Sequence, residues 1–163
     1  MCELHDRLVE HLTYDPDTGW FTYNHPGRKA RVGGRAGWDG ADGYRYLRFE
    51  GCVRGEHLWV VFYMTGSWPK DQVDHRRVGR EFRSDNRWSE LRVATRAQNG
   101  ANRLVRSNSV SGVKGVSKAS KNRWAARIGG GKTYLGCFDT KEAASEAVAM
   151  EAQKRYGEFA RMS

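Results

Sequence analysis

The sequence lacks any long apolar stretch. Its longest mostly apolar run, HLWVVFYM at residues 57–64, is less than half of the roughly 20 residues that a membrane-spanning helix needs. The N-terminal stretch MCELHDRLVEHL includes acidic residues and no small-residue cleavage site, so it does not have the pattern of a secretory signal. We therefore expect a cytoplasmic protein with no membrane partner.

Cysteine is scarce, and a nucleotide-binding signature is absent. Cys2, Cys52 and Cys137 are far apart and form no CxxC pair, which argues against a disulfide framework or a thiolate zinc site and predicts reduced, partly buried thiols. The glycine-rich segment 26–43 lacks the GxxxxGK[ST] pattern of a phosphate-binding loop. We expect this segment to be a long mobile loop.

Acidic residues are in the minority, and the imbalance lies in the second half. The 163 residues carry a net charge of +9. Residues 1–69 contribute −1, residues 70–103 contribute +4 and residues 104–163 contribute +6. With 39% hydrophobic and 29% charged residues, the composition is that of one globular domain or two small ones. The basic half suggests a nucleic-acid partner, although composition alone leaves open a basic surface that binds nothing.

Patterns in the first half predict short elements rich in β structure. Leu4, Leu8 and Leu12 have helical spacing, so residues 3–12 are predicted to form a helix. The turn sequence DPDTG precedes a predicted strand at 20–23, and GYRYLRFEGCVRGEHLWV has the pattern of a hairpin. The run HLWVVFYMTG fits a strand or a helix by pattern alone.

A strand–loop–strand–helix unit is predicted next. Two short strands are expected, around Val73 and at residues 91–94, on either side of a polar, arginine-rich loop. Thr95 and Gln98 have the spacing of a capping box. A helix should therefore begin at Thr95 and extend to about Arg106.

The remaining residues predict a separate module after the linker SNSVSG at 107–112. Three strand-like runs, GVKGVSK, RWAARIGG and TYLGCFD, precede the helical run DTKEAASEAVAMEAQKRYG. Asp139 and Glu142 predict the helix start, and Gly157 its end. The fold expected is α+β, with an N-terminal β-rich segment leading into the strand–loop–strand–helix unit, then a small three-stranded antiparallel sheet packed on one helix.

The stretch QVDHRRVGREFRSDNRWSELRVATRAQNGAN, at 72–102, contains residues suited to phosphodiester hydrolysis. Carboxylate and carboxamide oxygens bind a hard divalent ion, and a histidine with an ordinary pKa near ~6.5 can activate water. Asp74 and Asn99 are therefore candidate metal ligands, and His75 is the candidate base. Alternatively, these are turn-forming and helix-capping surface residues. The ordered series VDH, DNR, LRVAT and QN favours the catalytic interpretation.

These motifs resemble those of HNH endonucleases of the phage homing type, whose core is a ββα-metal fold. That family reads H-R-L, G-x-W-P, V-D-H, D-N-R, N-L-R and Q-N-x-x-N, and here the matching stretches are HLW, GSWP, VDH, DNR, ELR and QNGAN. Upstream, YDPDTGWFTY and DGYRYLRFEG resemble the segment that precedes this core. The resemblance implies a nuclease domain at 1–106 with its core at 57–106.

The resemblance also implies roles for individual residues. Asp74 and Asn99 would hold one divalent ion, Mg²⁺ or Mn²⁺, and His75 would be the general base. His57 matches the first histidine of the pattern, and either core packing or a phosphate contact would suit it. Supporting roles fall to Asn86, Glu90 and Asn102.

Two departures from the family pattern bear on activity. Glu90 stands where the family has an asparagine that ties down the loop and orients the histidine, and its charge can raise the pKa of the base or weaken activity. Leu58 and Trp59 replace Arg-Leu, which removes a cation near the phosphate path, and Asn86 can partly compensate. A DNA-binding regulator with a decayed, inactive nuclease core is therefore the alternative.

The C-terminal module, residues 113–163, resembles the plant ethylene-response-factor (Apetala-type) DNA-binding domain. The matching pieces are an early Gly-Val, WAARI, YLGCF, the alanine-rich helix and the closing GEFA. The family's sheet lies in the DNA major groove, with Trp124 expected in the core. The resemblance implies DNA contacts at Lys114, Ser117, Lys118, Lys121, Arg123, Arg127, Lys132 and Tyr134.

Alternatives for this sheet are a solvated basic face or an RNA-binding surface, although its aromatics do not form the stacking pair of an RNA-recognition motif. Ser117 replaces a residue that is often arginine in plant members, so its base preference should differ. The resulting expectation is a sequence-directed endonuclease or nickase acting on double-stranded DNA. It would be a monomer or weak dimer, located in the host cell cytoplasm if a phage encodes it.

Overall fold

The computed structural model describes residues 3–27, 31–105 and 107–161. It divides the chain into two compact units, Met1–Val93 and Ala94–Ser163. The division comes earlier than the domain end expected at residue 106, so the predicted strands at Val73 and 91–94 and the helix after Thr95 are described in different units. Arg106, Cys2 and residues 28–30 of the glycine-rich segment lie outside the described residues.

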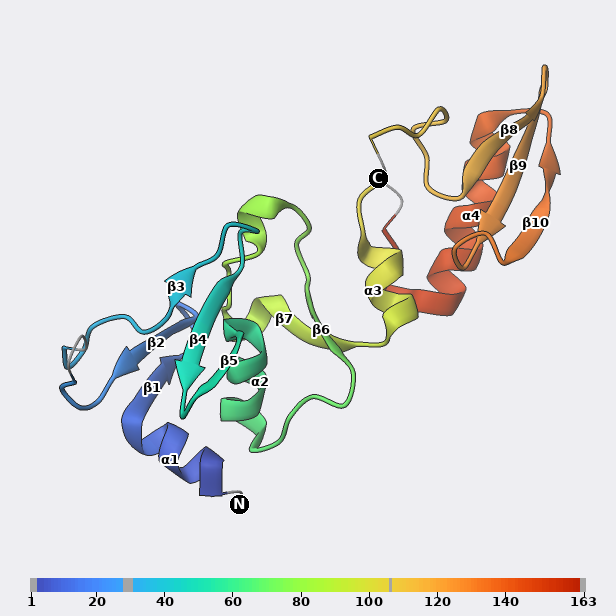
Figure 1. The fold of residues 1–163 in the computed structure, drawn as a ribbon. Helices are drawn as coiled ribbons and strands as arrows, with labels where there is room; N and C mark the ends of the chain where they lie inside the picture. Colours follow the sequence, from blue (N-terminus) through green and yellow to red (C-terminus); the bar gives the residue numbers. More distant parts are fainter. Residues whose placement is uncertain (1–2, 28–30, 106, 162–163) are drawn as a thin grey trace. The chain divides into compact units, whose positions relative to one another are not determined.

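The first unit consists of small antiparallel β elements and two helices (Figure 1). Strands β1 and β2 pair with each other, β3, β4 and β5 form a second sheet, and β6 pairs with β7. The bounds are α1 Glu3–His11, β1 Leu12–Asp15, β2 Trp20–Tyr23, β3 Trp38–Asp39, β4 Arg45–Phe49, β5 Cys52–Gly55, α2 Glu56–Thr65, β6 Gln72–His75 and β7 Leu91–Ala94, with single 3₁₀ turns η1 Arg80–Phe82 and η2 Trp88–Glu90.

The predicted N-terminal helix, the strand at 20–23, the hairpin and the two short strands of the 72–94 region are confirmed. The described part of the glycine-rich segment is more ordered than a mobile loop. It contains β3 and an isolated bridge between Thr22 and Arg35, and Ala36 is fully buried. Main-chain bonds to the neighbouring strands, including Ala36 N–H to Phe21 O at 2.7 Å, tie it to the sheets despite its few apolar side chains.

Helix α2 lies in the hydrophobic core of the first unit. Trp59, Val60 and Phe62 are almost completely buried, and the Trp59 indole donates a hydrogen bond to Leu47 O at 3.1 Å. Because α2 is apolar on nearly every side, it has no amphipathic period, which explains why the pattern alone fitted a strand equally well. Gly66 ends the helix in a left-handed conformation, with its N–H bonded to Phe62 O.

The second unit begins with the helix that follows β7. Its elements are α3 Arg96–Asn102, β8 Val116–Ser120, β9 Arg123–Ile128, β10 Thr133–Phe138, α4 Lys141–Tyr156 and the 3₁₀ turn η3 Gly157–Phe159. The capping box of Thr95 and Gln98 is confirmed, but the helix ends at Asn102, before the expected Arg106. Three antiparallel strands in the order β10-β9-β8, with α4 packed along the sheet, confirm the architecture predicted for this module (Figure 1).

Packing on one face of the sheet holds α4 in place. Val116 and Ala126 of the sheet meet Ala144 and Val148 of the helix, and Trp124 packs against this cluster, as predicted. The predicted start of α4 is wrong by one residue. Its N-cap is Thr140, whose hydroxyl accepts from the Ala143 N–H at 3.1 Å, whereas the carboxylate of the preceding aspartate is exposed and pairs with Arg123. Gly157 ends the helix, as predicted.

The expected linker at 107–112 is hydrogen-bonded to the following strand near its C-terminal end. Ser111 is buried, and its hydroxyl donates to Val116 O at 2.6 Å at the start of β8. Cys52 and Cys137 are free and partly buried thiols, as expected. None of the helices within the described ranges is both long and apolar enough to cross a bilayer.

The β1–β2 turn lies directly against the loop between β6 and β7. Gly19, at φ +74°, comes so close that a Cβ there would lie 2.4 Å from Arg87 N and 2.5 Å from the carbonyl carbon of Asn86. Gly51, in the β4–β5 turn, has almost the same φ of +76° but no atom within 4 Å of its Cβ position. A comparison of alanine substitutions at the two glycines therefore separates the cost of a left-handed backbone, which both share, from the cost of a steric clash, which only Gly19 would have.

We predict that Gly19→Ala lowers the free energy of unfolding by about 3 kcal/mol or more, because both the left-handed backbone and the adjacent main chain oppose a Cβ. Gly51→Ala, the matched control, should cost only about 1 kcal/mol. Urea denaturation of both variants measures the difference. Equal costs would show that the turn does not support the β6–β7 loop.

Candidate active site

His75 is the last residue of β6, and its imidazole is buried among side chains from separate segments. The ring of Tyr44 lies 5.9 Å from it and that of His57 5.5 Å, measured between centroids. Its Nε2 lies 3.4 Å from Asn86 Oδ1. Burial lowers the pKa of His75 from its ordinary value, although the Asn86 bond and the charge of Asp74 oppose that shift. A lowered pKa keeps the imidazole neutral near pH 7, which is the form that can accept a proton.

Asn86 connects His75 to a buried ion pair. Its Nδ2 donates to Glu56 Oε2 at 2.8 Å, and the Arg45 Nε donates to the same oxygen at 2.8 Å. Both Glu56 and Asn86 are at most 1% exposed. The main chain of Asn86 is also held, because the Tyr14 hydroxyl donates to its carbonyl oxygen at 2.7 Å. Asn86 therefore links the imidazole of His75 to the buried carboxylate of Glu56.

His57, in the first turn of α2, packs between the rings of Tyr44 and His75, each 5.5 Å away. Its Nδ1 is buried and has no hydrogen-bond partner among the described residues. Burial, together with the neighbouring His75, lowers the pKa of His57 to about 4. His57 thus packs in its neutral form against the candidate base.

The side chain of Asp74 contacts Arg92, whereas that of the adjacent His75 contacts Asn86. Its Oδ2 accepts from Nε and Nη2 of Arg92 on β7, at 3.1 and 3.0 Å, and both side chains are buried. A carboxylate there is an oxygen ligand of the kind that Mg²⁺ or Mn²⁺ prefers, and a metal would share it with the guanidinium. The described residues contain no group of three His, Cys, Asp or Glu side chains placed to hold a metal ion.

Asn99 and Asn102 lie on α3, in the second unit. The Asn99 N–H donates to Thr95 O at 2.9 Å in the first turn of the helix, where the sequence placed it. Asn102, its last residue, is buried. A carboxamide oxygen matches the chemistry of a hard cation, so the donor set of Asp74 and Asn99 fits such an ion chemically.

The charge of Glu90, the main departure from the family pattern, is compensated within its own loop. Its Oε2 accepts from Arg77 Nε at 3.1 Å. The neighbouring Asp85 is bridged by both Arg77 and Arg87, the latter through two bonds of 2.8 Å. The charge of Glu90 still acts on His75, since it raises the pKa of that imidazole and so opposes the lowering caused by burial. The glutamate therefore ties the loop down through an arginine, where an asparagine would use its amide.

The exposed face of the C-terminal sheet is the candidate nucleic-acid interface. Arg127 and Tyr134 are cross-strand partners, and the guanidinium carbon lies 5.6 Å from the centre of the tyrosine ring. Ser117 pairs with Ala125 on the same face. All of the predicted contact residues except Lys114 are exposed, namely Ser117, Lys118, Lys121, Arg123, Arg127, Lys132 and Tyr134.

Lys114 differs from the other predicted contacts. Its Nζ donates to Ala101 O at 2.6 Å and Arg161 O at 3.0 Å, and burial lowers its pKa to about 8. Its side chain therefore joins α3 to the end of the chain, and a substitution there would disturb this packing as well as any phosphate contact.

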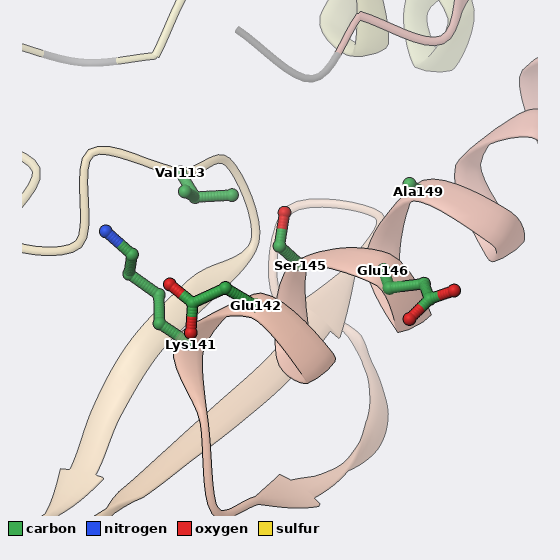
Figure 2. A pocket seen from close by; sticks show the side chains of 6 residues that line it. All are labelled: Val113, Lys141, Glu142, Ser145, Glu146 and Ala149. Carbon is green, nitrogen blue, oxygen red and sulfur yellow. The ribbon is translucent and has the colours of Figure 1, made fainter.

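A shallow groove beside α4 is unsuited to DNA. Figure 2 shows Glu142 and Glu146 lining it with Ser145, Lys141 and Val113. Two carboxylates against one ammonium would repel phosphates. The groove thus carries more acidic than basic side chains, whereas the predicted contact residues of the sheet include lysines and arginines and no acidic residue.

Sequence reasoning missed Arg45, Glu56, Tyr44 and Tyr14 around the histidine. An acidic residue at the start of an apolar helix is normally a solvated first-turn residue, so Glu56 carried no signal of burial. Arg45 meets it only because β4 leads through the hairpin back to α2. The hairpin register, which the sequence does not specify, would have been needed to pair them.

No protein-family model matches the chain, and comparisons with curated proteins and with solved structures give no match either.

The lowered pKa of His57 predicts a pH-dependent stability. The folded protein binds the proton only near pH 4, whereas the unfolded chain binds it near ~6.5, so the free energy of unfolding should fall as pH drops from about 6.5 to 4. One such proton contributes at most about 1.4 kcal/mol per pH unit. His57→Gln should flatten the slope, measured by urea denaturation at several pH values.

Val61→Ala is the matched control, because it removes buried volume from α2 without a titratable group. It should lower stability by a similar amount at every pH. A slope that His57→Gln leaves unchanged would show that this imidazole is protonated as readily in the folded protein as in the unfolded chain.

Proposed function

We propose that this protein is a metal-dependent DNA endonuclease that cuts one strand of duplex DNA, with His75 as general base. The observation that carries the proposal is a buried histidine kept neutral by its surroundings, held by Asn86 and adjacent to the Asp74 carboxylate. A general base needs an unprotonated acceptor near the operating pH and a fixed orientation, and both conditions are met here.

Asp74 and Asn99 are the residues proposed to hold one Mg²⁺ or Mn²⁺. When bound, such an ion neutralises a scissile phosphate and stabilises the oxygen that leaves. The motif order that resembles HNH nucleases supports this assignment, because it contains the aspartate, the histidine and the asparagine together. His75 would take the proton of the attacking water, while Asn86 keeps its ring in place and His57 with Tyr44 excludes solvent from one side.

The C-terminal sheet is proposed to supply binding to duplex DNA. Arg127, Arg123 and Lys118 offer charges to phosphates or guanine edges, and the excess positive charge of residues 104–163 lies in this unit. With binding and catalysis on separate parts of the chain, the C-terminal module would bind the target sequence, and His75 would act on a phosphodiester nearby. One catalytic histidine in each chain favours a nick over a double-strand break.

A DNA-binding regulator remains the second candidate, because of one specific contact. The two bonds from Arg92 to Asp74 compete with a metal ion for the same carboxylate oxygen. If that pair persists on DNA, the protein would bind without cutting.

The experiment compares wild type, His75→Ala and Arg127→Ala on supercoiled plasmid with Mg²⁺, Mn²⁺ or a chelator. Wild type should convert the plasmid to open circles only with a divalent ion. His75→Ala should bind DNA normally but nick it roughly 10²–10⁴-fold more slowly at saturating protein. Arg127→Ala should keep the saturating rate, bind more weakly, and flatten the dependence of log affinity on log salt by about one unit.

Lys154→Ala is the control for the arginine, because it removes one charge from α4, two residues after the buried Ala152 and so on the helix side facing away from the sheet. Its affinity should stay at the wild-type value. Wild type that binds duplex DNA yet leaves it intact with every divalent ion would establish the regulator instead.

A further inference from the structure

The buried pair of Arg45 and Glu56 is connected to the candidate base through one intervening side chain, that of Asn86. Glu56 is completely buried and Arg45 is 5% exposed. Each nitrogen of the guanidinium donates one bond: Nε to Glu56, Nη1 to Asp39 Oδ1 at 2.9 Å and Nη2 to Ala36 O at 2.8 Å. A buried ion pair adds little net stability compared with apolar residues of similar size. Its position is better explained by what it orients.

What it orients is the side-chain amide of Asn86. An amide has one end that donates and one that accepts, so its orientation must be decided by a neighbour of fixed character. Glu56 Oε2 is such a neighbour, because it accepts from both Arg45 and Asn86. Burial raises the pKa of this carboxyl, whereas the charge of Arg45 and the Asn86 bond lower it, and in the carboxylate form the oxygen can only accept. This places the NH₂ group of Asn86 toward Glu56 and its Oδ1 toward His75.

The orientation of Asn86 in turn decides where the imidazole carries its proton. The nitrogen facing Asn86 is Nε2, 3.4 Å from an oxygen that can only accept. A hydrogen on Nε2 would satisfy this contact, and in a neutral ring it leaves the lone pair on Nδ1.

We propose that Glu56, held by Arg45, is a positioning residue that fixes the tautomer of His75 through Asn86. The chain runs Arg45–Glu56–Asn86–His75, and each link is a contact between a donor and an acceptor. Its catalytic consequence depends on the proposed nuclease function, since the tautomer decides which nitrogen can take a proton from water. The tautomer itself does not depend on that function.

Because Arg45 and Asn86 bond to the same oxygen, two substitutions at Glu56 have opposite expected effects. Glu56→Gln keeps an oxygen for both donors, with its NH₂ group at the position of Oε1, which has no hydrogen-bond partner among the described residues. Asn86 should stay as it is. The double variant Arg45→Met with Glu56→Met removes the acceptor without leaving a buried charge, so the amide can turn over.

The readout is nitrogen-15 NMR of histidine-labelled protein at a pH where the ring is neutral. Wild type and Glu56→Gln should both show His75 with hydrogen on Nε2. The double variant should show a substantial fraction with hydrogen on Nδ1. Tyr14→Phe is the matched control, because it removes the bond to the Asn86 carbonyl and leaves the amide bonded to Glu56, so its tautomer should match wild type.

If the double variant does not fold, measurements on the wild-type protein alone test the orientation of the Asn86 amide. The amide protons of Asn86 should show nuclear Overhauser effects to Hε of Arg45 and none to the imidazole protons of His75. The reverse pattern would overturn the proposal, as would a folded double variant with the wild-type tautomer.

The nicking assay keeps the two claims separate. At saturating DNA, the double variant should cut at about one tenth of the wild-type rate or below, with unchanged affinity. Glu56→Gln should cut within about threefold of the wild-type rate. A wild type that never nicks would reject the nuclease, while the tautomer result would still stand. A nicking wild type with an unaltered tautomer in the folded double variant would reject the role of Glu56.

Discussion

The side-chain amide of Asn86 joins three segments that are distant along the chain. It lies between Glu56 at the start of α2 and His75 at the end of β6, and its own main chain rests on Tyr14 and on the turn that contains Gly19. A loop with few apolar residues would otherwise be free to move. The placement of the histidine therefore depends on one polar side chain that has a partner at each end of its amide.

The surrounding architecture serves this placement. Helix α2 is buried through Trp59, Val60 and Phe62, so its first turn is fixed, and that turn carries both Glu56 and His57. Desolvation by the same core keeps both imidazoles neutral. Packing and proton chemistry are thus linked, because the burial that stabilises the unit also lowers the pKa of the proposed base.

Much of the local structure was predictable from the sequence, and the failures have physical causes. The capping box of Thr95 and Gln98 and the strands around Val73 and Leu91 follow from nearest-neighbour chemistry, and the structure confirms them. The start of α4 was missed because aspartate and threonine both cap helices, and only the local geometry selects Thr140. Helix α2 was left undecided because complete burial removes the periodic signal.

The candidate site was predictable only in its ordered motif. Asp74, His75, Asn86 and Asn99 can be read from the sequence, whereas the bonds of Arg45 and Glu56 arise from tertiary contacts between a hairpin and a helix. Lys114 illustrates the converse, since a lysine in a basic module looks like a phosphate contact but donates to two main-chain carbonyls here. Charge alone does not show which way a side chain points.

The most direct test of the proposed active site is paramagnetic relaxation by Mn²⁺, observed on the side-chain signals of His75 and Asn99. A single ion held by Asp74 and Asn99 should broaden both signals at substoichiometric Mn²⁺, and Asp74→Asn should weaken both effects together. Broadening at only one of the two residues, or broadening that survives Asp74→Asn, would contradict a metal site shared between the strand and the helix.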